Sequence, residues 1–274
     1  MIISPNVKPS AVLLAAALIV SACGDKEPDN TPTPEPIAQT RAAEPAAAPD
    51  NLRSRLADAS RAEADRARDE NRKPADVIDF LGIEPGMKVI DLMAGGGWYT
   101  EVLSLAVGAD GEVVAHNTDA ALQFRDGANE KAISERLAGN RLPNVTRLNK
   151  NFDEISADHG SFDAAITALN FHDVYNGSGP NAAVEVLQTV YEILEPGGVL
   201  GIIDHSGTAD ADNKALHRAE KDKTIDTAKA AGFVVEADSD LLRNESDDHS
   251  RPVFDESVRG RTDRFLLKLR KPAV

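Results

Sequence analysis

Cysteine and known metal-binding motifs are almost absent from the sequence. Cys23 is the single cysteine among 274 residues, so neither an internal disulfide nor a zinc site built on paired cysteines can form. Six histidines are present, but none has the HExxH or HxH spacing of a metal motif. The sequence therefore carries no known metal-binding motif.

Positive charge is also scarce. Thirty lysines and arginines stand against 45 aspartates and glutamates, which leaves a net charge of −15 at pH 7. A chain this acidic is repelled by a polyphosphate backbone, which argues against general binding to nucleic acid. The length, in contrast, suffices for a large hydrophobic core.

No apolar run is long enough for a membrane-spanning helix. Residues 11–20 form the hydrophobic part of a signal peptide, which ends in Ser21-Ala22-Cys23. This ending resembles a bacterial lipobox, in which residues 1–22 are removed and Cys23 is lipidated. The alternative is a plain signal peptide with an incidental cysteine. Because the single cysteine stands at this position, we expect a lipoprotein on the periplasmic face of the inner or outer membrane of a bacterial envelope.

Residues 23–50 have the composition of a tether. Six prolines fall within residues 24–50, and large apolar side chains are nearly absent there. Such a segment cannot offset the entropy cost of ordering by burying apolar surface. We therefore expect a lipidated cysteine followed by a disordered tether, with the folded domain at residues 51–274.

The domain begins with a strongly charged segment, residues 51–73. Charges of both signs alternate along it with few apolar positions, which predicts one helix over about 52–71. One interpretation is a solvent-exposed helix with ion pairs between residues four apart. The alternative is a lid over a ligand pocket.

Strands and helices alternate in the remainder of the domain. This order predicts a parallel sheet covered by helices on both faces, with ligands at the carboxyl ends of the strands. Strands are expected at 89–92, 113–115, 145–148, 162–169, 199–203, 233–236 and 265–269. Helices are expected at 74–81, 98–107, 119–137, 182–194 and 224–231.

Two turns carry a resemblance to a known family. Val89-Ile90-Asp91-Leu92 followed by three glycines at 95–97, and Pro196-Gly197-Gly198 before the fifth strand, resemble class I S-adenosylmethionine-dependent methyltransferases. The resemblance covers roughly residues 74–270. It implies a Rossmann-like α/β three-layer sandwich with a seven-stranded mixed sheet, the last strand antiparallel. A narrower likeness to predicted bacterial envelope methyltransferases rests on residues 95–101, 172–173, 204–205 and 262–265.

The resemblance places S-adenosylmethionine, the implied cofactor, at the first glycine turn. Glycines there let the backbone approach a ligand. The residues expected at the cofactor are Asp91, Ala94, Gly95 and Gly97, whereas Met93 replaces the first glycine of the family pattern. Asp91 has two interpretations, an orienting contact to the cofactor's ammonium or a tie between loop amides.

The cofactor's nucleoside part is expected at the ends of the second and third strands. The family usually has acidic residues there, and this chain has Asn117 and Asn151 instead. An amide can still accept one hydrogen bond and donate another. We expect Asn117 to bind the ribose, Asn151 and Phe152 to bind the adenine, and Asn170 to lie near the cofactor.

Residues 170–173 follow the fourth strand, where the family brings the methyl group to its acceptor. A base helps methyl transfer when the acceptor is a hydroxyl. His172, oriented by Asp173, is the predicted catalytic pair. The alternatives are a histidine that only caps backbone groups and a divalent metal site shared with Asp204 and His205.

Four further residues are weaker candidates for contact with the acceptor. Tyr99 follows the glycine turn, His205 follows the fifth strand, and His217 and Arg218 lie before the last predicted helix. Packing or solvent exposure explains these residues equally well.

Methyl transfer from S-adenosylmethionine to a small molecule is the expected function. A catalytically inactive lipoprotein that senses a nucleoside-like or other small ligand is the alternative, which the two replaced acidic residues favour. An NAD-dependent oxidoreductase is a second alternative. The Pro-Gly-Gly turn and the missing acidic ribose contact argue against it.

Overall fold

Hydrophobic strands alternate with amphipathic helices throughout residues 51–273, which are the residues that this computed structural model describes. They belong to one compact unit, residues 47–274. The predicted signal peptide, the lipidation site Cys23 and the predicted tether all lie outside the described residues. Within the described part of the chain, no helix has the length and hydrophobicity that crossing a membrane requires.

Seven strands form a single mixed sheet in the order β3-β2-β1-β4-β5-β7-β6, which confirms the predicted fold class. Neighbouring strands are parallel except at β7, which pairs antiparallel with both β5 and β6. The central strand is β1, where Ile90 lies opposite Val114 on one side and Ala165 on the other. The strands are β1 (Lys88–Leu92), β2 (Glu112–Asn117), β3 (Val145–Asn149), β4 (Phe162–Ala168), β5 (Leu194–His205), β6 (Val234–Ser239) and β7 (Arg264–Arg270).

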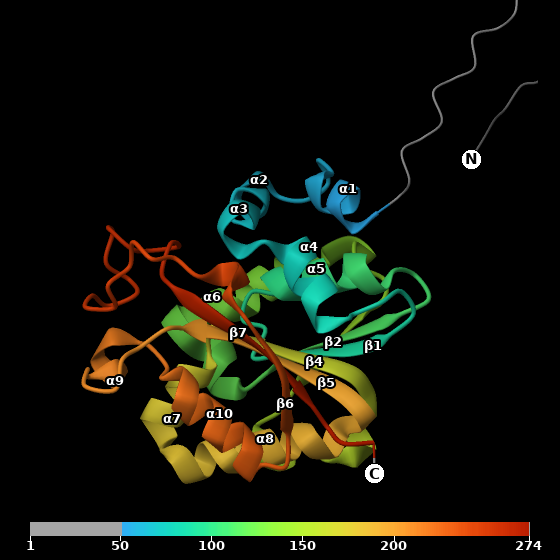
Figure 1. Cartoon of the computed structure of the whole chain (residues 1–274). Helices are drawn as coiled ribbons and strands as arrows, with labels where there is room; N and C mark the ends of the chain where they lie inside the picture. The colour runs from blue at the N-terminus through green and yellow to red at the C-terminus, as the bar shows by residue number, and fades with distance from the viewer. Residues whose placement is uncertain (1–50, 274) are drawn as a thin grey trace, which may run out of the picture. The chain divides into compact units, whose positions relative to one another are not determined.

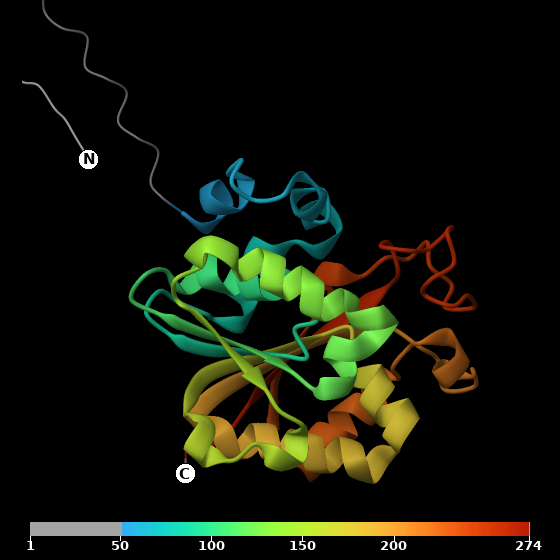
Figure 2. The same cartoon turned by 180° about the vertical axis from the view of Figure 1, so that it is seen from behind.

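Helices cover both faces of the sheet (Figures 1 and 2). Successive side chains of β2 point to opposite faces of the sheet and show the two layers. Val113 and Ala115 pack on the face covered by α4, α5 and α6. Val114 packs on the face covered by α8 and α10. The helices are α1 (Leu52–Ala57), α2 (Glu63–Arg66), α3 (Asp69–Arg72), α4 (Pro74–Leu81), α5 (Trp98–Val107), α6 (Asp119–Leu137), α7 (Phe171–Ser178), α8 (Pro180–Ile193), α9 (Asn213–Leu216) and α10 (Lys221–Ala230), with 3₁₀ turns at Ala138–Asn140, Phe152–Glu154, Ala157–His159 and Asp240–Leu242.

The charged N-terminal segment is not one helix. It forms the three short helices α1, α2 and α3, because the Asp58 side chain accepts the amide of Ser60 and competes with helical hydrogen bonding. Pro74 disfavours helical backbone at the residue before it, and Lys73 adopts φ 44°. The interpretation as a solvent-exposed helix is also wrong in part, since Arg61 is 2% exposed and Asp65 is 8% exposed.

Candidate active site

The turn between β1 and α5, residues 93–97, forms the glycine loop at the carboxyl edge of the sheet. Met93, Gly95 and Gly97 have φ angles of 51°, 55° and 79°. Glycine adopts such angles without strain, whereas Met93 does so at some cost. A Cβ on Gly97 would lie 2.6 Å from the Ile133 side chain of α6. Gly97 is therefore needed for packing against α6, which was not the predicted reason for a glycine there.

Asn117 at the end of β2 braces the glycine loop. Its side-chain oxygen accepts from the Gly95 amide at 2.8 Å, and its side-chain nitrogen donates to the Gly95 carbonyl at 3.2 Å. The side chain is 1% exposed. The structure thus gives the amide a partner within the protein, in place of the predicted contact to ribose.

The predicted adenine residues also have partners within the protein. Asn151 caps a 3₁₀ turn with its side chain, and its own backbone amide donates to Glu154. The Phe152 ring packs edge-on against His116 at 4.8 Å between centroids. His116 is buried, which lowers its pKa, and its Nδ1 accepts from the Met93 amide at 3.4 Å. These residues therefore support the glycine loop from the side of β2 and β3.

A cleft of about 520 Å³ opens beside the glycine loop, and we call it the loop cleft. One wall comes from the sheet edge and the start of α5, which contribute Asp91, Trp98, Tyr99 and Asn170. Its other wall comes from the N-terminal segment. The complete lining is Asp65, Arg68, Arg72, Asp91, Met93, Ala94, Gly95, Gly96, Trp98, Tyr99, Asn129, Ala132, Arg136, Ala168, Leu169 and Asn170.

The N-terminal segment is attached to the loop cleft by buried polar contacts. The Asp65 carboxylate pairs with Arg136 at 2.8 Å, and the Asp65 carbonyl accepts from the Trp98 indole at 3.2 Å. Arg136 in turn donates to the Gly96 carbonyl at 2.8 Å and pairs with the buried carboxylate of Glu101. The segment therefore covers the loop cleft, in agreement with the lid interpretation.

An acidic and a basic side chain, Asp91 and Arg72, both line the loop cleft. Burial raises the pKa of Asp91 to about 7, despite a hydrogen bond from the Thr100 hydroxyl at 2.6 Å. Burial likewise lowers the pKa of Arg72 to about 10. The Arg72 guanidinium lies 4.5 Å from the centre of the Trp98 ring and makes no hydrogen bond or ion pair with any residue among 51–273. Among the described residues, neither the Asp91 carboxylate nor the Arg72 guanidinium therefore has an ion-pair partner that neutralises its charge.

Asn170 connects the glycine loop to the end of β4. Its side-chain nitrogen donates to the Met93 carbonyl at 3.0 Å and to the Ala168 carbonyl at 2.9 Å. Helix α7 begins at the next residue and carries the predicted catalytic histidine. The contact therefore places the start of α7 beside the loop cleft.

His172 is oriented by Asp204 and not by the predicted Asp173. The Asp204 carboxylate is completely buried, and it lies 2.8 Å from His172 Nδ1 and 2.7 Å from the His172 amide. Asp173 lies on the other side of the ring, with Oδ1 at 3.3 Å from His172 Nε2. Burial opposes protonation of His172, but the charge and hydrogen bond of Asp204, together with Asp173, outweigh burial and raise its pKa.

His217, which was a weak candidate for contact with the acceptor, lies beside His172 and Asp173. Its Nδ1 lies 3.3 Å from the same Asp173 oxygen, and its ring centre lies 5.7 Å from that of His172. The exposed Phe254 ring packs against the outer side of His217 at 4.9 Å. The three side chains His172, Asp173 and His217 therefore converge, and we call them the His-Asp-His cluster.

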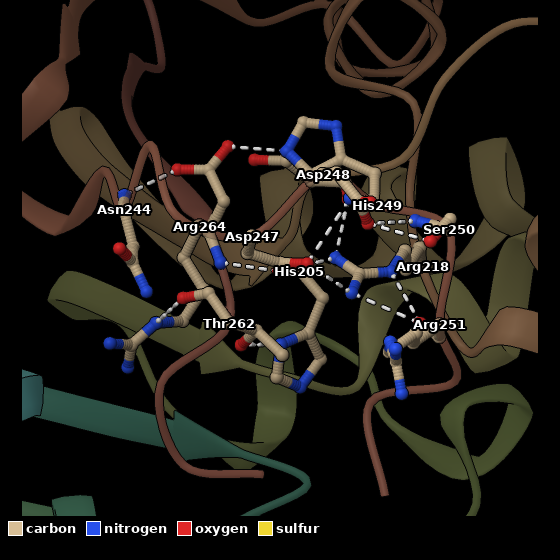
Figure 3. A network of polar contacts seen from close by, with 12 residues as sticks. His205, Arg218, Asn244, Asp247, Asp248, His249, Ser250, Arg251, Thr262 and Arg264 are labelled. Carbon is tan, nitrogen blue, oxygen red and sulfur yellow. Dashed lines mark hydrogen bonds and ion pairs between the residues drawn. The ribbon is translucent and has the colours of Figure 1, made fainter. Parts of the chain in front are cut away.

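The remaining weak candidates have structural tasks. Arg218 is 0% exposed and makes a two-point ion pair with Asp247 at 2.9 and 3.0 Å, as Figure 3 shows. The prediction that it reaches an anionic acceptor is therefore wrong. His205 Nδ1 contacts the Thr262 hydroxyl at 2.6 Å, and burial lowers its pKa to about 3, which keeps the ring neutral (Figure 3).

Sequence reasoning missed Arg72 and the role of Asp204. Arg72 stands in a run of alternating charges, where nothing local distinguishes it from its exposed neighbours. For Asp204 a signal existed, because an acidic residue at the end of a buried strand needs a partner at the same sheet edge. His172, which follows the neighbouring strand β4, is that partner.

Comparison with known proteins identifies the family. A model described as the ubiE/COQ5 methyltransferase family matches residues 70–220. A protein of Idiomarina loihiensis named ubiquinone/menaquinone biosynthesis C-methyltransferase UbiE is 29% identical over 193 residues, which are 70% of this chain and 66% of that protein. A protein of the same name from Pasteurella multocida is 28% identical over 130 residues, which are 47% of this chain and 44% of that protein. The chain thus covers less than two thirds of the length of these relatives.

Solved structures show the same fold. A SAM-dependent methyltransferase from Aquifex aeolicus matches with a TM-score of 0.55 and 20% identity, over 80% of this chain and 96% of that one. The [4+2]-cyclase SpnF matches with a TM-score of 0.53 and 14% identity, over 74% of this chain and 81% of that one. The likeness to a cyclase shows that the fold alone does not determine the reaction. Because the family model spans more than half of the sequence, the chain belongs to the ubiE/COQ5 methyltransferase family.

Proposed function

We propose that the protein transfers a methyl group from S-adenosylmethionine to a small-molecule acceptor. The observation that carries this proposal is the pair of opposite charges in the loop cleft. The amino-acid end of the donor has an ammonium and a carboxylate, which complement Asp91 and Arg72. A ligand that brings both charges offsets the burial cost of both side chains.

The residues of the loop cleft fit the amino-acid end of the donor. The glycine loop supplies backbone groups at the start of α5, Asp91 supplies a carboxylate, and Arg72 supplies a cation held against Trp98. When bound, S-adenosylmethionine supplies an electrophilic methyl group on a sulfonium sulfur. The N-terminal segment excludes water from this part of the cleft.

The acceptor side of the site is the His-Asp-His cluster. We assign His172 Nε2 as the group that acts on the acceptor, because Asp204 occupies Nδ1 and Nε2 faces the exposed Asp173. Relatives named as C-methyltransferases of ubiquinone and menaquinone biosynthesis favour a carbon atom of a small molecule as the methylated position.

Replacement of Arg72 by methionine tests whether this arginine binds the carboxylate of S-adenosylmethionine. Arg72→Met keeps the aliphatic contact with Trp98 and removes the charge. We expect affinity for S-adenosylmethionine and S-adenosylhomocysteine to fall at least tenfold, which corresponds to about 1.4 kcal/mol. Affinity for 5′-methylthioadenosine, which lacks the amino-acid end, should remain unchanged in calorimetric titrations.

The matched control is Arg66→Met on the same segment. Arg66 donates to the carbonyls of Ala57 and Asp58 and lies outside the lining of the loop cleft. The control should bind all three ligands like the unchanged protein. An Arg72→Met protein that loses affinity for methylthioadenosine to the same extent would contradict a contact to the carboxylate.

We further propose that the protein is a lipoprotein of the bacterial envelope, anchored through Cys23 on the periplasmic face. The support is the apolar run that ends in Ser21-Ala22-Cys23 and the proline-rich segment that follows it. Cys23→Ala should abolish incorporation of labelled fatty acid and leave an uncleaved or soluble product. Unchanged mass and unchanged membrane retention would argue against the anchor.

A further inference from the structure

One ligand atom from each side chain of the His-Asp-His cluster lies within 4.8 Å of the other two. We propose that His172, Asp173 and His217 bind one divalent transition-metal ion at the carboxyl end of β4. The sequence predicts no such site by motif, because His217 directly follows the distant helix α9 and only the fold brings it to α7.

The distances within the cluster suit a small ion. Asp173 Oδ1 lies 3.3 Å from His172 Nε2 and 3.3 Å from His217 Nδ1. An ion with tetrahedral bonds of about 2.0–2.1 Å separates its ligand atoms by about 3.3 Å. Two of the three separations therefore match, and rotation of the His217 side chain, which is 40% exposed, can adjust the third.

Asp204 prepares His172 to be a ligand. A carboxylate only accepts hydrogen bonds, so its contact at 2.8 Å places the proton of the neutral ring on Nδ1. The lone pair is then on Nε2, which faces Asp173 and His217. The arrangement carboxylate–histidine–metal is common in metal sites, where the outer carboxylate fixes the ring and increases the basicity of the ligand.

The ligand types indicate which ions suit the site. Two imidazoles and one carboxylate favour Zn²⁺, Co²⁺, Mn²⁺ or Fe²⁺, whereas Mg²⁺ and Ca²⁺ favour oxygen ligands throughout. Three protein ligands leave at least one coordination position open, as in catalytic sites. Asp173 is 64% exposed, so this position is accessible from solvent.

The role of the ion rests on the proposed function. Asn170 connects the start of α7, which carries His172 and Asp173, to the glycine loop, so the cluster lies at the same edge of the sheet as the proposed donor site. A divalent ion there would bind an oxygen atom of the acceptor and stabilise its deprotonated form. His172 would then act on the acceptor through the ion. Binding of the ion itself can be tested without donor or acceptor.

The experiment uses Co²⁺ and Zn²⁺ alone as probes. The purified protein is treated with a chelator and titrated with Co²⁺, and visible absorption is recorded. We expect one Co²⁺ per chain with the intense d–d bands of a four- or five-coordinate site, displaced by one equivalent of Zn²⁺. His217→Ala and Asp173→Asn should each weaken Co²⁺ binding at least about tenfold.

Two further variants complete the test. Asp204→Asn removes the outer carboxylate and should weaken Co²⁺ binding about 10–100-fold. His249→Ala is the matched control, because His249 forms a separate histidine–aspartate pair with Asp263 at 2.9 Å. This control should bind Co²⁺ like the unchanged protein.

Two results would overturn the proposal. One is the absence of Co²⁺ and Zn²⁺ binding up to millimolar concentration in the unchanged protein. The other is binding that persists in both His217→Ala and Asp173→Asn, whose side chains are exposed enough to be replaced without loss of the fold. If the protein still bound S-adenosylmethionine in either case, only the metal site would be disproved. The proposal that the loop cleft binds S-adenosylmethionine would be unaffected.

Discussion

Turnover of the His172→Ala protein is expected to fall at least ~100-fold, with affinity for S-adenosylmethionine within a few-fold of the unchanged protein. In the proposed site His172 acts on the acceptor, either as a base or as a ligand of the proposed ion, and proton transfer by a positioned side chain alone contributes about 10²–10⁴-fold in rate. Donor affinity should persist because His172 is not part of the loop cleft. The measurement is transfer of a labelled methyl group into a small-molecule fraction of cell extract, which supplies the unidentified acceptor.

His249→Ala serves as the control for this measurement too. His249 pairs with an aspartate, as His172 does, but it lies on the loop that follows Asp247 and should not affect turnover. If His172→Ala transferred methyl groups at the rate of the unchanged protein, then His172 would only cap backbone groups. If His172→Ala also lost affinity for S-adenosylmethionine, the substitution would have rearranged the carboxyl edge of the sheet, including the loop cleft.

Arg218→Met is expected to reduce the free energy of unfolding by about 3–5 kcal/mol at pH 7. The side chains of Arg218 and Asp247 are 0% and 1% exposed. Arg218 also donates to the carbonyls of Ser206 and Arg251, and so joins three segments at one point (Figure 3). Methionine leaves the Asp247 charge buried without its partner. In a domain of this size the loss corresponds to a fall in Tm of about 6–20 °C.

A second substitution separates the buried charge from the packing. In the double variant Arg218→Met, Asp247→Leu no uncompensated carboxylate remains, so part of the stability should return. Thermal and denaturant unfolding of both variants make the comparison. A loss of less than about 1 kcal/mol in Arg218→Met would show that the ion pair contributes little, and would reopen a role in ligand binding.

The sheet and the glycine loop could be predicted because their signals are local. Runs of apolar residues such as 89–92 identify buried strands, and glycines identify turns that need positive φ angles. The seven-stranded mixed sheet and its antiparallel last strand came from the family resemblance, and the structure confirms both.

The partners of the site residues could not be predicted, because they come from distant parts of the chain. Asp173 is adjacent to His172 in sequence, yet the ring is oriented by the buried Asp204, which reaches helix α7 from the end of β5. Arg218 is polar and was expected at the surface, but Asp247 allows its burial. In the N-terminal segment, burial of Arg61 and Asp65 against the rest of the domain overrides the helical charge pattern.

The position of β7 determines when the domain can be completed. This strand lies between β5 and β6, so the interior of the sheet remains open until residues 264–270 have been synthesised. Before then β6 has no strand to pair with, and β5 presents an unpaired edge. The native seven-stranded sheet therefore forms only after the last strand in the sequence has been synthesised, and removal of residues 264–270 would separate β6 from the rest of the sheet.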